Sequence, residues 1–132
     1  MKELTIHSNK REEFIILDQK LQSFIDESNV QDGVLTIFVP HTTAAVTINE
    51  NADPDVTRDI INHLGKMVPH HAGFSHSEGN SDAHIKSSLL GPSLQCLVSD
   101  GRLVFGTWQS VYFCEFDGPR SRKIFLKLVE EK

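Results

Sequence analysis

The last third of the chain constrains the fold most strongly, because it alternates short apolar runs with turn residues. Residues 94–99 and 102–106 flank Asp100-Gly101, a dipeptide typical of a two-residue β-hairpin turn. Further strands are expected at 110–116 and 122–129. Short consecutive strands joined by tight turns predict an antiparallel sheet.

The first half of the chain adds strands and two helices. Strands are expected at 4–6, 13–17, 34–39 and 42–49, and helices from Asp18 to before Gly33 and from Asp53-Pro54 to Gly65. Asp18 and Asp53 suit the N-cap position, and each helix has one apolar face. We therefore expect one α+β domain over residues 1–132, an antiparallel β-sandwich-like sheet with two helices packed on one side.

Composition excludes several classes of protein. The formal net charge is −5, so a nucleic-acid partner is not expected. No stretch approaches the roughly 20 apolar residues that cross a membrane. Cys96 and Cys114 lie in apolar strand-like runs and are expected to be buried free thiols. These features favour a cytoplasmic protein without a membrane partner.

Histidines mark the candidate metal site. His41 directly follows a buried strand, and His76 and His84 bracket part of a long polar segment at 66–83. A loop of this length can fold back and bring both imidazoles to one ion. The alternatives are a hydrogen-bonded His41 at a strand break and a solvated loop with incidental histidines.

Two carboxylates are candidates for catalysis. Glu50 ends a strand, where functional groups gather, although a solvated turn residue would look the same. Glu115 alternates with apolar residues inside a strand, so it needs a cation, a metal or hydrogen-bond donors. A salt bridge with Arg120 or Arg122 is the structural alternative for Glu115.

Other polar residues suit an anion or a flat ligand. Lys86 and Ser87 are donors to a phosphate-like group, and Lys86 would face the same way as His84 in an extended segment. Arg120 lies in a turn where it could bind an anion. Trp108 and Gln109 could form a stacking wall for a heterocycle, or an oligomer interface.

Five motifs together resemble the YjbQ-like family, also called the secondary thiamine-phosphate synthase family. They are His41-Thr42-Thr43-Ala44-Ala45, Asn49-Glu50-Asn51-Ala52-Asp53-Pro54, His84-Ile85-Lys86-Ser87-Ser88, Gly106-Thr107-Trp108-Gln109 and Glu115-Phe116-Asp117-Gly118-Pro119-Arg120. The resemblance covers almost the whole chain.

The resemblance implies a sandwich-like subunit that forms a homotrimer and weakly joins a pyrimidine pyrophosphate to a thiazole phosphate. It implies a metal cluster at His41, His76 and His84, with Glu50 and Glu115 at the family's acidic positions. Zn²⁺ is the expected ion, with Mg²⁺ or Mn²⁺ as alternatives. The expected partner is a small phosphorylated heterocycle or a phosphate-like anion.

Two other functions stay open: a metal-dependent hydrolase in which Glu50 activates water, and a non-catalytic oligomer that binds a metal or an anion.

Overall fold

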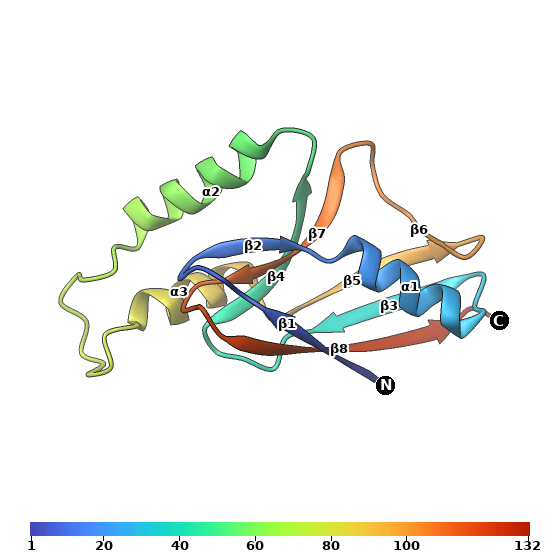
Figure 1. The fold of residues 1–132 in the computed structure, drawn as a ribbon, viewed down its shortest axis with the longest axis horizontal. Coiled ribbons are helices and arrows are strands. Elements are labelled where there is room, and N and C mark those ends of the chain that lie inside the picture. Colours follow the sequence, from blue (N-terminus) through green and yellow to red (C-terminus); the bar gives the residue numbers. More distant parts are fainter.

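A computed structural model describes all residues, 1–132, as eight strands and three helices (Figure 1). In chain order the elements are β1 (Lys2–His7), β2 (Glu13–Ile16), α1 (Asp18–Ser28), β3 (Gly33–Phe38), β4 (Ala44–Glu50), α2 (Pro54–Met67), α3 (Ser81–Leu90), β5 (Ser93–Ser99), β6 (Arg102–Leu103), β7 (Gln109–Glu115) and β8 (Ser121–Glu130). None of the three helices is long and apolar enough to cross a membrane.

The strands form two antiparallel sheets. The larger has the order β1-β8-β3-β5-β6, and the smaller has the order β2-β7-β4. Register follows the apolar alternation, since Leu35 pairs with Cys96 on one side and Leu128 on the other. Asp100 and Gly101 have positive φ values of 51° and 74°, so the predicted hairpin turn between β5 and β6 is confirmed.

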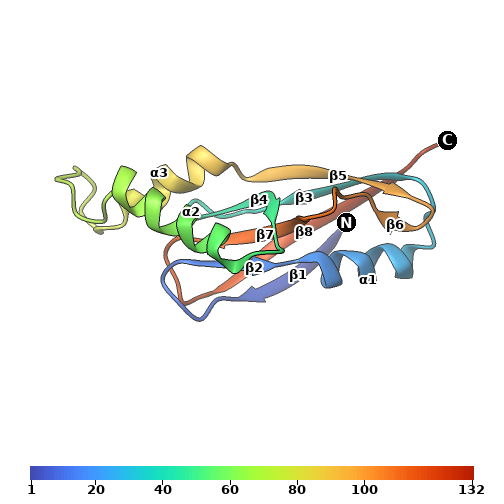
Figure 2. The same cartoon turned by 90° about the horizontal axis from the view of Figure 1, so that it is seen from above.

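The main core lies between the larger sheet and a layer made by the smaller sheet and α1 (Figure 2). Leu21 and Ile25 of α1 are fully buried in it. The opposite face of the smaller sheet packs on α3 through Ala45, Ala83 and Cys114. Buried apolar side chains on both faces of β7 explain why this strand is buried almost throughout.

The expected fold class, an α+β sandwich-like arrangement of antiparallel strands, is confirmed, but the helices differ from expectation. There are three helices, not two, and they do not share one side. Residues 81–90, expected to be partly loop and partly extended, form α3. The helix α2 lies at the periphery and has no fully buried residue (Figure 1).

The two predicted helix caps have different outcomes. Asp53 accepts a hydrogen bond from the Asp55 N–H at 2.9 Å, and Pro54 is the first helical residue, so this cap is confirmed. Asp18 is not a cap: it lies inside α1, and its carboxylate accepts bonds from the Ser110 hydroxyl and the Val111 N–H. That carboxylate connects α1 to β7 instead of capping the N-terminus of the helix.

Candidate functional site

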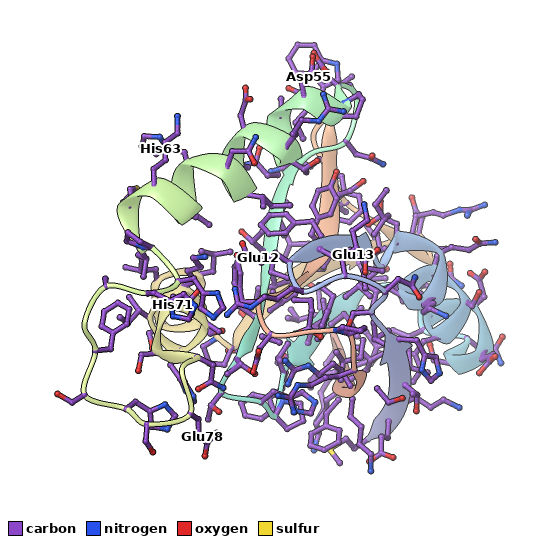
Figure 3. The ribbon with its side chains drawn as sticks, turned by 60° about the vertical axis from the view of Figure 1, so that its left-hand side comes forward. Glu12, Glu13, Asp55, His63, His71 and Glu78 are labelled. Atoms are coloured by element: carbon purple, nitrogen blue, oxygen red, sulfur yellow. The ribbon has the colours of Figure 1, made fainter.

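A pocket of about 690 Å³ lies where four segments meet. Its wall comes from the end of β3 and the chain after it, the loop before α3 together with His84 of α3, Pro92 just before β5, and Arg120 and Arg122 around the start of β8. The lining residues that carry polar side chains are His41, Thr42, Thr43, His76, Glu78, Asn80, His84, Arg120 and Arg122. Figure 3 shows Glu78 on the loop between α2 and α3 and His63 directed away from the body of the molecule. The pocket therefore joins a rigid strand end to a polar loop.

All three predicted metal histidines line this pocket, but only two of them touch. The rings of His76 and His84 stand edge to face with their centres 5.4 Å apart. No group of three His, Cys, Asp or Glu side chains lies close enough to hold an ion. The predicted three-histidine ligand set therefore stays a prediction, with His76 and His84 as its assembled part.

His41 is held by the backbone of β8. Its Nε2 accepts a hydrogen bond from the main-chain N–H of Lys123 at 2.9 Å. In the β3–β8 register Lys123 would pair with Pro40, where β3 has already ended, so the imidazole replaces the missing strand partner. Burial, and after it the charge of Arg122, holds the pKa of His41 below its usual value. The lowered pKa favours the neutral form of His41.

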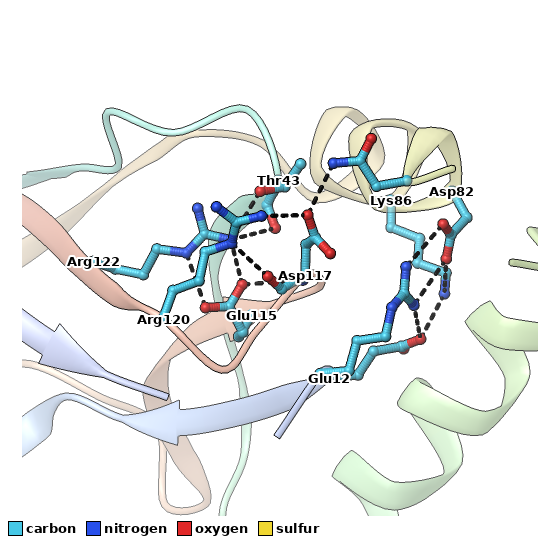
Figure 4. Close-up of polar contacts among 10 residues, drawn as sticks. Glu12, Thr43, Asp82, Lys86, Glu115, Asp117, Arg120 and Arg122 are labelled. Carbon is cyan, nitrogen blue, oxygen red and sulfur yellow. Dashed lines mark hydrogen bonds and ion pairs between the residues drawn. The ribbon is translucent and has the colours of Figure 1, made fainter. Parts of the chain in front are cut away.

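Glu115 forms a buried ion pair with Arg122, whose side chain lines the pocket (Figure 4). Its carboxylate is fully buried and accepts bonds from Arg122, from the Ser8 hydroxyl at 2.7 Å and from the Asp117 N–H at 3.1 Å. Burial alone would raise the pKa of Glu115, but these donors, Arg122 first, hold it below its usual range. A carboxylate engaged in this way is a poor base, so the structural alternative for Glu115 holds and its expected catalytic role loses support.

Asp117 joins the arginine turn to the histidine loop. Its Oδ2 accepts from Arg120 Nη2 and from Asn80 Nδ2, both at 2.9 Å (Figure 4). Because the carboxylate fixes Nδ2, the amide oxygen of Asn80 is left buried without a partner. Arg120 Nη1 and Arg122 Nη1 have no protein partner, although both side chains line the pocket. The site thus offers free cationic donors and one unsatisfied acceptor.

Lys86 and Ser87 do not reach the pocket, contrary to expectation. Residues 84–86 are helical, and positions two apart on a helix face different directions. Lys86 is 1% exposed and pairs with Asp82 at 3.4 Å and Glu12 at 3.0 Å (Figure 4). Ser87 is buried as well, and its hydroxyl has no partner. The expected anion-binding role of Lys86 and Ser87 therefore loses its geometric basis.

Glu50, Trp108 and Gln109 lie at the opposite end of the smaller sheet. Glu50 is the last residue of β4 and pairs with Gln109, the first residue of β7. His41 precedes the start of the same strand, so roughly 20 Å of β4 separates it from Glu50. Trp108 is 63% exposed and lies beside this end. These residues cannot share a ligand with the histidine pocket of the same chain.

Sequence reasoning missed several pocket residues. Glu78 and Asn80 lie within the histidine loop, and Arg122 was considered only as an ion-pair partner of Glu115. An arginine on the inward face of β8, alternating with Ile124 and Leu126, was the available signal, since a buried guanidinium needs acceptors.

Comparison with known proteins gives a consistent result. Residues 2–131 match the family described as UPF0047 protein YjbQ-like. The chain is 53% identical over 127 residues to a UPF0047 protein of Methanocaldococcus jannaschii, covering 96% of this chain and 92% of that protein. It is 45% identical over 130 residues to the UPF0047 protein YugU of Bacillus subtilis, covering 98% of both.

Solved structures agree. An uncharacterised conserved protein of the YjbQ/UPF0047 family from Clostridium acetobutylicum superposes with a TM-score of 0.96 at 50% identity, over 98% of this chain and 100% of that one. A conserved hypothetical protein from Thermus thermophilus gives a TM-score of 0.92 at 38% identity, over 98% of this chain and 100% of that one. The chain belongs to the YjbQ-like UPF0047 family.

Proposed function

We propose that the histidine pocket is the site of a metal-assisted enzyme that acts on a phosphorylated heterocycle, as the resemblance to secondary thiamine-phosphate synthases implies. One observation carries the proposal: Arg120 and Arg122 both line the pocket, and each has a guanidinium nitrogen without a protein partner. Guanidinium groups match phosphate oxygens in shape and charge. The pocket is therefore suited to a phosphate or a diphosphate group.

The pair His76 and His84 suits a metal ion. Two imidazoles that share one tetrahedral Zn²⁺ at normal bond lengths place their ring centres roughly 5 Å apart, and these rings are 5.4 Å apart. Bound there, Zn²⁺ would supply charge stabilisation for phosphate oxygens. Glu78 lines the same pocket and is a further ligand candidate, and a carboxylate would shift the preference toward Mg²⁺ or Mn²⁺.

The proposed reaction needs little from the protein beyond charge and position. The thiazole nitrogen forms a bond to the methylene carbon of the pyrimidine as the bond to pyrophosphate breaks, and the electron pair leaves on pyrophosphate. Arg120 and Arg122 would stabilise that leaving charge. The buried amide oxygen of Asn80 lacks a donor and lies in a pocket-lining residue, so it suits an N–H or O–H of the ligand.

The hydrolase alternative has less support. It relied on Glu50 to activate water, and Glu50 lies at the far end of β4. The third function, a protein that binds a metal or an anion without turnover, would use the same pocket, so a test for product formation distinguishes it from the proposed enzyme.

We expect the protein purified without a His tag to form thiamine phosphate from a pyrimidine pyrophosphate and a thiazole phosphate, with release of pyrophosphate. His84→Ala should lower the rate roughly 100-fold. Loss of a residue that merely hydrogen-bonds to a metal ligand costs about 10–100-fold in activity, and loss of the ligand itself should cost at least as much. His63→Ala, on the exposed face of α2, is the matched control and should leave the rate unchanged. Pyrophosphate and Zn²⁺ binding in calorimetry without product would instead indicate a binding protein.

We also propose a cytoplasmic homotrimer. Cys96 and Cys114 are both buried and free of disulfide bonds, which suits a reducing compartment. Phe38, Leu97 and Val129 are each more than 40% exposed on the uncovered face of the larger sheet. Phe38 also lines the pocket, so a neighbouring copy on this face would border the site.

Light scattering should therefore give about three times the chain mass of 14.8 kDa. Leu97→Lys places a charge on the exposed apolar face and should reduce the mass to that of one chain. Gln19→Lys, on the exposed side of α1, is the control and should leave the trimer intact. A parent protein with the mass of one chain at micromolar concentration would contradict the trimer.

A further inference from the structure

The contact between His41 and Lys123 determines which ring nitrogen of His41 faces the pocket. A main-chain N–H can only donate, so Nε2, which lies 2.9 Å from the Lys123 nitrogen, must be the acceptor. In a neutral imidazole one nitrogen accepts and the other carries the proton. The proton of His41 is therefore on Nδ1.

Nδ1 of His41 is the nitrogen available to a ligand. It makes no hydrogen bond within the protein, and it is not among the buried polar atoms that lack a partner. His41 lines the pocket, so this nitrogen can be reached from it. Because Nε2 accepts the N–H of Lys123, it carries no proton and the ring is in its neutral form. His41 thus offers an N–H group, as do the free nitrogens of Arg120 and Arg122.

A metal ligand would need the opposite arrangement. An imidazole nitrogen binds a metal through its lone pair, and the lone pair of His41 already accepts the Lys123 N–H. Turning the ring to present a lone pair to the pocket would leave that N–H without its acceptor at the point where β3 ends. His76 and His84 have no such backbone bond, and their rings already touch.

We propose that His41 is a hydrogen-bond donor for a phosphoryl oxygen, fixed with its proton on Nδ1 by the backbone of Lys123, and is not a metal ligand. This inference rests on the proposed function, because it assumes that the pocket binds a phosphate group. The ligand class that fits is an ionised phosphate or diphosphate, whose oxygens only accept and can bond to Arg120, Arg122 and His41 together. A ligand that presents an amine or another cation to these donors does not fit.

The proton position can be read without any ligand. In ¹⁵N-labelled protein, a long-range proton–nitrogen correlation spectrum distinguishes a protonated from an unprotonated ring nitrogen. We expect Nδ1 of His41 to be protonated and Nε2 to be the acceptor. A spectrum with the proton on Nε2 would overturn the inference.

Two substitutions separate the two sides of the ring. Glutamine places an amide near the Nε2 position and can still accept from Lys123, whereas asparagine places an amide near the Nδ1 position and leaves Lys123 unpaired. His41→Gln should keep the melting temperature and bind pyrophosphate about tenfold more weakly. His41→Asn should melt at a lower temperature but keep more of the pyrophosphate affinity. Equal pyrophosphate affinity in the parent and His41→Gln would overturn the donor role.

Zn²⁺ alone tests the ligand role. In calorimetry, His41→Gln should bind Zn²⁺ as the parent does, and His84→Gln should bind it at least tenfold more weakly. Loss of Zn²⁺ binding in His41→Gln would make His41 a ligand and overturn the inference. If the parent binds neither pyrophosphate nor Zn²⁺, the proposed function fails as well, which distinguishes that result from a failure of His41 alone.

Discussion

Arg122→Met is expected to lower the free energy of unfolding by about 3–5 kcal/mol, because it leaves the Glu115 carboxylate buried without its counter-ion. Glu115 is fully buried and Arg122 is 4% exposed, so water cannot replace the lost partner. The remaining donors, the Ser8 hydroxyl and the Asp117 N–H, are neutral. Chemical denaturation gives the free energy, and the melting temperature should fall by roughly 10 °C or more.

Arg120→Met is the matched control. Arg120 also pairs with a carboxylate, that of Asp117 at 2.9 Å, but its side chain is 54% exposed. An exposed pair contributes about 0–1 kcal/mol, so this variant should be nearly as stable as the parent. The double variant Arg122→Met with Glu115→Leu should recover most of the lost stability, because no charge is then left buried. A cost below about 1 kcal/mol for Arg122→Met would contradict a structural role for the pair.

Local sequence signals predicted those elements whose chemistry lies within a few residues. The Asp53 cap with Pro54 located the start of α2, and Asp100-Gly101 located the β5–β6 turn. Both depend on the backbone preferences of the residues themselves. Tertiary contacts then modified the details: Asp18 suits a cap, yet its carboxylate bonds to β7, and α1 starts at Asp18 without any side-chain cap.

The helix α3 could not be recognised from hydrophobic periodicity, because its buried face is not apolar. That face consists of Asp82, Ala83, Lys86 and Ser87. The two charges are tolerated because Arg11 and Glu12, in the connection between β1 and β2, pair with them. Partners about 70 residues away in sequence leave no local signal.

The candidate site was only half predictable for a similar reason. His41, His76, His84 and Arg120 were identified by residue type, and all four line one pocket. Glu50 was assigned to the same site, but β4 carries the chain away from it before Glu50 is reached. The antiparallel pairing of β4 with β7 places Ala44 beside Glu115 at one end of the sheet and Glu50 beside Gln109 at the other. The composition of the chain does not reveal that pairing.

Asp82→Ala is expected to lower the free energy of unfolding by about 3 kcal/mol, although Asp82 lies next to a pocket loop and looks like a surface residue in the sequence. It is fully buried and holds Arg11 by two hydrogen bonds of 3.1 and 3.2 Å, and Lys86 at 3.4 Å. Burial alone would raise the pKa of Asp82, but the bonds from Arg11, with its charge and that of Lys86, hold it below the usual range. Asp55→Ala, which breaks the exposed pair with Arg58, should cost less than about 1 kcal/mol.

The double variant Asp82→Leu with Lys86→Met tests what this cluster is for. If the cluster only packs α3 onto the sheet, apolar side chains of similar volume should restore stability relative to Asp82→Ala. Since neither residue lines the pocket, the double variant should bind pyrophosphate as the parent does in calorimetry. Binding at least tenfold weaker in a stably folded double variant would show that Lys86 contributes to anion binding after all. Equal binding would show that the buried lysine has no part in recognising the ligand.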